Sequence, residues 1–398
     1  MTTSTIDAES LLALEIGSVT TRAVLFDVVE GRYRYLGAGT APTTAGAPYH
    51  NIFDGVRGAL NELQLVTGRS FISAEGQLLT PTRPDGSGVD ACVASLSVGP
   101  PLKVLAIGLL EEVSTESAKN LATTTYAQVI ETMSLNDRRK TTARLDNILR
   151  LRPDLVVVAG GVEKGASQSV LSLLEGVGLA CGVLPKEQRP EVLFAGNSSL
   201  VKDVQQTLGS LASLHVAPNV RPSLDIEQLT PAQPALAQVF RHVRARQIRG
   251  VQDVDLWTGG KLLPSAMAFG RTIRYVSMEF TTKGVLGVDV GASATTIASA
   301  FAGDLILSVQ SDLGLGENLP GILNLCSPED VLRWLPLELS ADKLRDYIYN
   351  KSLYPGSIPI TGEELLIEQA LATQAMYLAV RQARKSYPST VHAPLPGL

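Results

Sequence analysis

Cysteine and histidine are scarce in this sequence, with three and four copies in 398 residues. Cys92, Cys181 and Cys326 lie far apart, and none belongs to a CxxC or Cys/His motif. No two histidines are spaced as metal ligands either. The sequence therefore predicts neither a zinc site nor a disulfide framework, and free cysteines fit a reducing, cytoplasmic location.

Excess charge and long apolar runs are also lacking. The net charge of −5 argues against nucleic acid or an anionic membrane as a partner. No apolar run approaches the length that spans a bilayer, and the N-terminus lacks the basic flank and apolar core of a signal peptide. We expect a soluble protein with no membrane span. One basic cluster has helical spacing, which favours a solvated helix face: Arg241, His242, Arg244, Arg246 and Arg249.

Hydrophobic residues make up 45% of the chain and charged residues 18%, which is enough apolar material for ordinary cores. At this length two or three domains are expected. We predict a first half with a turn motif, an inserted α/β subdomain, a connector with a helical segment, a second half with a turn motif, and a loose tail. Their predicted bounds are residues 1–100, 101–217, 218–283, 284–385 and 386–398.

One short motif occurs twice and organises the chain. Residues 14–23 and 288–297 each read as a buried strand, a Gly/Ser/Thr turn and a second strand. Glu15 aligns with Asp289, Gly17 with Gly291 and Thr21 with Thr295, each pair 274 positions apart. The constant offset indicates a duplicated unit.

The chemistry of such a turn suits a phosphate group. Exposed backbone N–H groups and hydroxyls can hold phosphate oxygens, and a carboxylate at the end of the strand can hold Mg²⁺ or its waters. A single copy would be weak evidence, because an acid, a glycine and a threonine at hairpin spacing occur in many β-turns. Two copies at equivalent positions are a much stronger signal.

Between the two motifs the pattern alternates between strand and helix, which predicts a doubly wound α/β unit. Strands are predicted at residues 103–109, 155–159, 180–184, 192–195 and 214–217, and one helix is predicted from Ser114 with an inner face reaching Met133. The loop with Gly160 and Gly161 follows a strand, where open α/β sheets bind ligands. It is a possible second site for a nucleotide or cofactor, although a glycine-permitted βα turn is the simpler interpretation.

Paired phosphate-type turns in a duplicated sheet resemble the superfamily of actin, sugar kinases and heat-shock chaperone ATPases. More specifically, the chain resembles the glutamate mutase L (MutL/GlmL) family. This resemblance rests on segments in one order along the chain, at residues 16–21, 41–44, 104–109, 154–161, 194–197, 288–296 and 311–315. It implies an α/β protein with a duplicated actin-like (ribonuclease H-like) ATPase fold and an inserted doubly wound subdomain. Family members are associated with cobalamin-dependent carbon-skeleton mutases.

The resemblance also implies a nucleotide site for ATP and Mg²⁺. Glu15 and Asp289 would be the catalytic and metal-binding carboxylates. The nucleotide-binding residues would be Gly17, Ser18, Thr20, Thr21 and Arg22 in the first turn, and Gly291, Ala292, Ser293, Thr295 and Thr296 in the second.

Three departures from the family pattern bear on activity. The family has Asp at the position of Glu15 and Lys at that of Arg22, and neither exchange is neutral at a metal or phosphate. The superfamily's adenosine-holding Gly-Gly motif is not recognisable beyond Gly316.

Two functions therefore stay open at this stage. One is an ATP-dependent chaperone or reactivating factor whose partner is a cobalamin-dependent mutase or its own subunits. The other is a catalytically silent actin-fold scaffold that binds a protein partner. A sugar or acyl kinase is a weaker third option, because no acceptor-activating motif stands out.

Overall fold

The computed structural model describes residues 8–165, 168–280 and 282–387. The chain divides into two units. Unit 1 contains Met1–Gly99, Arg244–Ile306 and Gln310–Leu398, and unit 2 contains Pro100–Val243 and Leu307–Val309. The fold is mixed α/β, as the alternating sequence pattern predicts.

The first sheet of unit 1 has the strand order β10-β4-β1-β2-β3. Its strands are β1 (Ser10–Ile16), β2 (Thr20–Val29), β3 (Arg32–Pro42), β4 (Ala91–Leu96) and β10 (Leu263–Pro264). β1, β2 and β3 form an antiparallel meander, whereas β4 runs parallel to β1. Helix α1 (Phe53–Thr67) packs closely on β3, where a Cβ added to Gly39 would lie 2.2 Å from the carbonyl O of Ala59.

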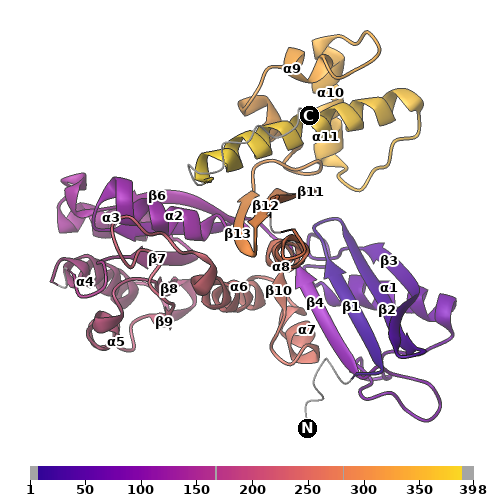
Figure 1. Ribbon diagram of the computed structural model, residues 1–398, viewed down its shortest axis with the longest axis horizontal. Helices are drawn as coiled ribbons and strands as arrows, with labels where there is room; N and C mark the ends of the chain where they lie inside the picture. The colour runs from indigo at the N-terminus through magenta and orange to yellow at the C-terminus, as the bar shows by residue number, and fades with distance from the viewer. Residues whose placement is uncertain (1–7, 166–167, 281, 388–398) are drawn as a thin grey trace. The chain divides into compact units, whose positions relative to one another are not determined.

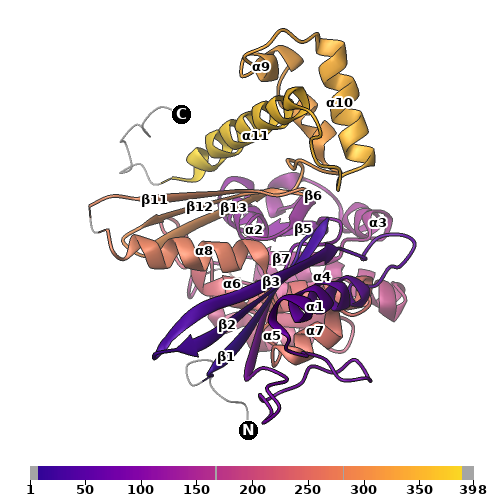
Figure 2. The ribbon, with the colours of Figure 1, turned by 90° about the vertical axis from the view of Figure 1, so that its right-hand side faces the viewer.

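The second sheet of unit 1 has the order β11-β12-β13. Its strands are β11 (Val285–Val290), β12 (Thr295–Phe301) and β13 (Asp304–Gln310). Figure 2 shows helix α8 (Ser265–Ser277) on one face of this sheet and the long helix α11 (Gly362–Ala383) on the other. Helices α9 (Pro328–Leu332) and α10 (Ala341–Leu353) complete an apolar core with α11.

Unit 2 is a doubly wound parallel sheet, visible with its helices in Figure 1. The strand order is β6-β5-β7-β8-β9, built from β5 (Leu102–Gly108), β6 (Ala127–Met133), β7 (Leu155–Ala159), β8 (Glu191–Phe194) and β9 (Ser213–Val216). The core of one face is formed with α3 (Thr141–Leu151), α4 (Gln168–Val183) and α5 (Val201–Leu208). Helix α2 (Glu116–Ala122) packs against β5 and β7.

Helix α6 (Gln233–Gln247) crosses the boundary between the units, and α7 (Val251–Trp257) follows it. The predicted solvated face of α6 is wrong at one position: Arg244 has 0% of its surface exposed. Its guanidinium Nη1 donates to Gln247 Oε1 at 2.6 Å, and it packs beside Gly99. Charge spacing along a helix does not reveal that a side chain is covered by another segment.

Three further sequence predictions are corrected. Residues 127–133 form strand β6 rather than the end of a helix, because α2 stops at Ala122 before three threonines. Residues 180–184 continue or directly follow helix α4 instead of forming a strand. The prolines and glycines before residue 101 predict a loop-rich stretch that is either a small insertion or a connection to another domain, whereas residues 91–96 of this stretch form β4 of the first sheet.

Within the described ranges no helix is both long and apolar enough to cross a bilayer. The predicted tail at residues 386–398 lies almost wholly outside the described residues. The described Tyr387 belongs to unit 1, where its hydroxyl is hydrogen-bonded to that of Ser299.

Candidate functional site

The two predicted turns form hairpins with the same register. In the first, Glu15 is paired with Arg22 and Ile16 with Thr21. In the second, the residues 274 positions later are paired in the same way, Asp289 with Thr296 and Val290 with Thr295. The strand–turn–strand prediction is confirmed in both copies.

The same backbone hydrogen bond closes each turn. The Gly17 N–H donates to the carbonyl O of Thr20 at 3.0 Å, and the Gly291 N–H donates to that of Ala294 at 2.9 Å. A Cβ added to Gly17 would lie only 2.9 Å from the Thr20 carbonyl O, which explains the glycine. The two sequences therefore fold into one turn geometry.

The tips of both turns present amides at matching positions. Among the described residues, no hydrogen bond is made by the amide N–H groups of Ser18 and Val19, or of Ala292 and Ser293. Amides grouped at a turn in this way can receive an anion. The donor set fits phosphate oxygens.

A loop behind the first turn holds it in place. The Thr43 amide donates to the carbonyl O of Val19 at 2.8 Å, and the Thr43 hydroxyl donates to that of Gly17 at 2.8 Å. The hydroxyls of Thr21 and Thr43 are 2.9 Å apart and hydrogen-bonded. Thr21 is fully buried, so its hydroxyl supports the turn through this hydrogen bond with Thr43.

The second turn is held by the glycine-rich corner after β13. The amides of Leu315 and Gly316 donate to the carbonyls of Gly291 and Ala292 at 3.0 and 2.7 Å. The Asn318 side-chain amide donates to the carbonyl O of Ser293 at 2.7 Å. No motif in the sequence singled out Asn318, because a lone asparagine in a loop has no pattern of its own.

Buried hydroxyls of the second turn also face inward. The Thr295 hydroxyl donates to the carbonyl O of Leu313 at 2.8 Å, and both Thr295 and Thr296 are buried. Ser18 and Ser293 are half-buried, and Thr20 is exposed. The predicted site residues thus separate into a buried set that supports the turns and an accessible set at their tips.

Glu15 and Asp289 occupy the same position in their hairpins, and the charge of the first carboxylate acts on the second. Both side chains are exposed at the end of their strand. Surrounding protein atoms remove part of the hydration of Asp289 and raise its pKa above the usual 3.8, and the negative charge of Glu15 raises that pKa further. A pair of carboxylates that solvent can reach is a suitable ligand set for Mg²⁺.

The connection between α10 and α11 approaches both turns. A Cβ added to Gly356 would lie 3.4 Å from Val19 Cγ1 in the first turn. One added to Gly316, beside the second turn, would lie 3.1 Å from Pro355 Cβ. A segment of the chain itself therefore borders the site.

The predicted second site at Gly160 and Gly161 is built into unit 2 as a tight turn. Both glycines are buried. The carbonyl of Gly160 accepts from the Asn197 amide at 3.0 Å, and that of Gly161 accepts from the Asn219 side chain at 3.1 Å. These bonds fit a glycine-permitted βα turn, and a ligand role for the two glycines stays a prediction.

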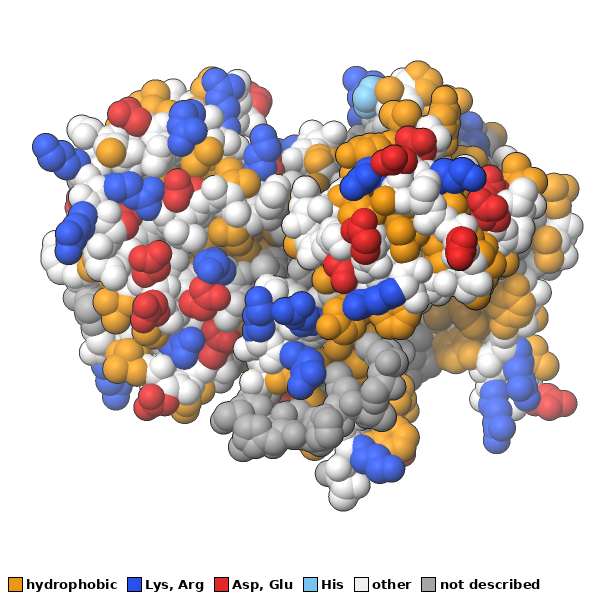
Figure 3. Space-filling view, turned by 90° about the horizontal axis from the view of Figure 1, so that it is seen from above, with side chains coloured by type: hydrophobic (Ala, Val, Ile, Leu, Met, Phe, Trp, Pro, Cys, Tyr) orange, Lys and Arg blue, Asp and Glu red, His pale blue; other side chains and the backbone are white. Residues whose placement is uncertain are grey.

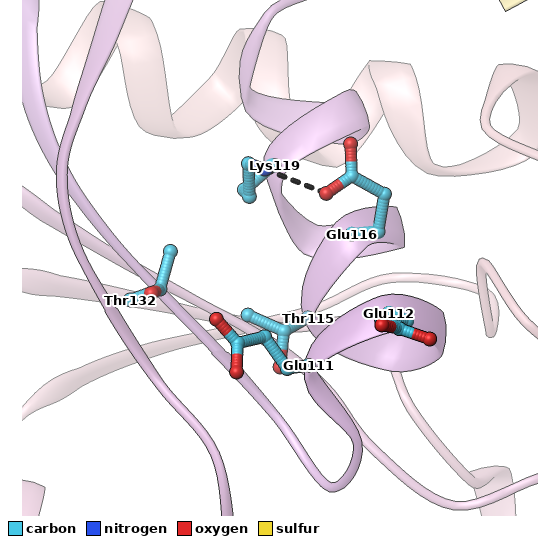
Figure 4. A pocket seen from close by; sticks show the side chains of 6 residues that line it. All are labelled: Glu111, Glu112, Thr115, Glu116, Lys119 and Thr132. Atoms are coloured by element: carbon cyan, nitrogen blue, oxygen red, sulfur yellow. Dashed lines mark hydrogen bonds and ion pairs between the residues drawn. The ribbon is translucent and has the colours of Figure 1, made fainter. Parts of the chain in front are cut away.

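A separate pocket of about 400 Å³ opens in unit 2 beyond the end of β5, shown in Figure 4. Three of its six lining residues are glutamates, and its one lysine, Lys119, forms an ion pair of 2.6 Å with Glu116. Gly160 and Gly161 are not among the residues that line it: Glu111, Glu112, Thr115, Glu116, Lys119 and Thr132.

Comparison with known proteins gives a consistent family. A family profile described as MutL protein matches residues 11–391. Protein MutL of Clostridium tetanomorphum is 22% identical over 301 residues, which cover 71% of this chain and 63% of that protein. The chain thus spans less than two thirds of the length of this curated relative.

The solved structures that match this chain have low structural similarity to it. A diol dehydratase-reactivating factor in nucleotide-free form has 11% identity and a TM-score of 0.28, covering 85% of this chain and 76% of that one. An Aquifex aeolicus member of the Ppx/GppA family has 8% identity and a TM-score of 0.24, covering 95% and 91%. Scores this low carry no argument about the fold.

Proposed function

Because the chain belongs to the MutL protein (glutamate mutase L) family, we propose that it is an ATP-binding, actin-fold chaperone or reactivating factor. Its partner would be a cobalamin-dependent carbon-skeleton mutase of the glutamate mutase type. We place this activity in the cytoplasm, in keeping with the free cysteines. The partner and the location both derive from the sequence and its family resemblance.

One observation carries the nucleotide proposal. Two hairpins from distant parts of the chain share one turn geometry, and the amides at their tips make no hydrogen bond with the described residues. Glu15 and Asp289 occupy matching positions, and the charge of Glu15 acts on Asp289. A single turn of this kind is common, but a matched pair around two carboxylates suits a chain of phosphates with its metal ion. Each turn joins two antiparallel strands in a sheet of its own, and this repetition supports a duplicated actin-like fold.

The proposed roles follow from the atoms that are accessible. The amides of Ser18, Val19, Ala292 and Ser293 would hold phosphate oxygens. Asp289 would hold Mg²⁺ and its waters, and Glu15 would position water or metal. Bound Mg²⁺ would neutralise phosphate charge. The repulsion between Glu15 and Asp289 would be relieved at the same time, which favours metal binding.

Chaperone action needs two conformations that differ in affinity for the partner. The turns belong to different sheets of unit 1, so a nucleotide held by both would bring the two hairpins together. We propose that this closure changes the affinity of the protein for the mutase. The connection at Pro355 and Gly356, which borders both turns, would move with it.

A specific observation also favours a silent scaffold as the second candidate. The α10–α11 connection exposes large apolar side chains, with Ile358 79% and Ile360 89% exposed. In Figure 3, seen from the side of the C-terminal helices, hydrophobic side chains lie between charged ones. Together with Glu15 and Arg22 in place of the family's Asp and Lys, this surface fits partner binding without turnover.

Reactivation of an inactivated mutase distinguishes the two candidates. A glutamate-mutase-type enzyme that carries damaged cobalamin would be incubated with this chain, ATP, Mg²⁺ and intact coenzyme. The chaperone proposal expects activity to return with the wild type and with Asp304→Ala, a control at an exposed acid of unit 1, and not with Asp289→Ala. Stable binding to the mutase without nucleotide-dependent reactivation would support the scaffold instead.

A further inference from the structure

Unit 2 brings together two histidines and a glutamate that lie apart in the sequence. Glu191 is the first residue of β8, His215 lies in the neighbouring edge strand β9, and His242 lies on α6. One ligand atom from each of the three side chains lies within 4.8 Å of the other two. The geometry points to a binding site for a divalent transition metal at this cluster.

The strand register explains how the sheet places two of the ligands. β8 and β9 are parallel, with Glu191 opposite Ser213 and Leu193 opposite His215. His215 Nε2 and Glu191 Oε2 are hydrogen-bonded at 2.7 Å. This hydrogen bond holds the His215 ring beside the Glu191 carboxylate, so two of the ligand atoms are close together before a metal binds.

Helix α6 supplies the third ligand. The rings of His215 and His242 have centroids 5.2 Å apart at an interplanar angle of 49°, so they are tilted rather than stacked. Ligands about 2.1 Å from a tetrahedral ion lie roughly 3.4 Å from one another. His242 is exposed, so its side chain can make the small adjustment that closes the site.

Burial and chemistry favour a metal over a plain hydrogen-bond cluster. Glu191 is 4% exposed, and a bound cation would compensate the charge of a carboxylate that is buried this deeply. Two imidazoles and one carboxylate suit zinc, iron(II), cobalt or nickel, whereas Mg²⁺ and Ca²⁺ prefer oxygen ligands. Three protein ligands leave a coordination position for water or a small ligand. A bound ion would also fasten α6 to the edge of the sheet.

Titration of the untagged, full-length chain with Co²⁺ tests this site, because Co²⁺ bound to histidine has visible absorption that Zn²⁺ removes by displacement. We expect one Co²⁺ per chain, displaced by Zn²⁺ and not by Mg²⁺ or Ca²⁺. His242→Ala, His215→Ala and Glu191→Gln should each weaken binding by at least about tenfold. His242→Ala is the safest of these variants, because the side chain is exposed.

The matched control is His50→Asn, which removes an exposed histidine of unit 1 and suits the positive φ of 48° at that position. This variant should bind Co²⁺ as the wild type does. Absence of Co²⁺ and Zn²⁺ binding by the wild type would overturn the inference. Unchanged affinity in a folded His242→Ala variant, checked by circular dichroism, would overturn it equally.

Discussion

Partial burial and, after it, the charge of Glu15 raise the pKa of Asp289, although Glu15 and Asp289 are 274 positions apart in the sequence. Each occupies the same place in its own hairpin, one residue before the last of the strand that enters the turn. The strands and the turns thus give the two copies of a repeated sequence the same local structure.

The first prediction concerns pH. Partial burial and then Glu15 hold the pKa of Asp289 above its usual 3.8, so the folded protein retains this proton longer than the unfolded chain. The resulting stabilisation is fully present below pH 3.8 and is lost as pH rises through the higher, folded-state pKa. Between pH 3.8 and that folded-state pKa, the unfolding free energy of the wild type should fall as pH rises because of Asp289. Asp289→Asn should remove this part of the fall, and Asp304→Asn should not.

A carboxyl NMR titration measures the same effect directly. Glu15→Gln should lower the pKa of Asp289 towards 3.8, and so should added Mg²⁺. An Asp289 pKa that is identical in the wild type and in Glu15→Gln would show that the two carboxylates do not interact.

The second prediction concerns the corner that supports the second turn. A Cβ added to Gly314 would lie 2.4 Å from the carbonyl O of Ala292. Because this oxygen belongs to the backbone, the turn itself would have to shift to make room. Gly314→Ala should therefore cost about 1–3 kcal/mol of unfolding free energy in urea. Gly46→Ala, whose added Cβ meets nothing within 4 Å, should stay within about 0.5 kcal/mol. Equal effects in both variants would contradict the close packing.

The third prediction concerns the buried hydroxyl of Thr295. Thr295→Val keeps the shape of the side chain but leaves the buried carbonyl of Leu313 without this donor. We expect a loss of about 1–3 kcal/mol in unfolding free energy. Thr272→Val, at an exposed position of α8, is the control and should change little. A neutral Thr295→Val would mean that the hydroxyl does not support the turn.

The fourth prediction concerns the thiols. Burial raises the pKa of Cys92 to about 12 and that of Cys181 to about 11. At mildly alkaline pH both should stay protonated and react slowly with a disulfide reagent until denaturant is added. The half-buried Cys326 should react first. Rapid labelling of native Cys326→Ser would show that the two cores are more open than described.

Much of the fold could be predicted because its signals are local. The repeated hairpins and most strands of unit 2 follow from apolar periodicity and turn residues. Val129, Ile130 and Met133 were misassigned because their spacing also fits one face of a helix. Only the neighbouring strand β5 decides the matter, by pairing with residues 127–133.

The rest of the site depends on contacts between distant segments. The sequence predicts that the turn hydroxyls face a ligand, but Thr21 and Thr295 are buried behind the turns by residues 43 and 313. Asn318, the α10–α11 connection and the Glu191–His215–His242 cluster carry no spacing motif at all. Contacts with segments that are distant in the sequence position these residues, and a single sequence does not show which distant segments meet.

The most direct test of the nucleotide proposal is thermal unfolding with and without Mg·ATP, on the wild type, Asp289→Ala and Asp304→Ala. At a hundred times the dissociation constant, bound ligand should add about 2.7 kcal/mol of stability. We predict a higher melting temperature for the wild type and Asp304→Ala, and no shift for Asp289→Ala. The absence of a shift in the wild type at saturating Mg·ATP, or a full shift in Asp289→Ala, would contradict a nucleotide site between the two turns.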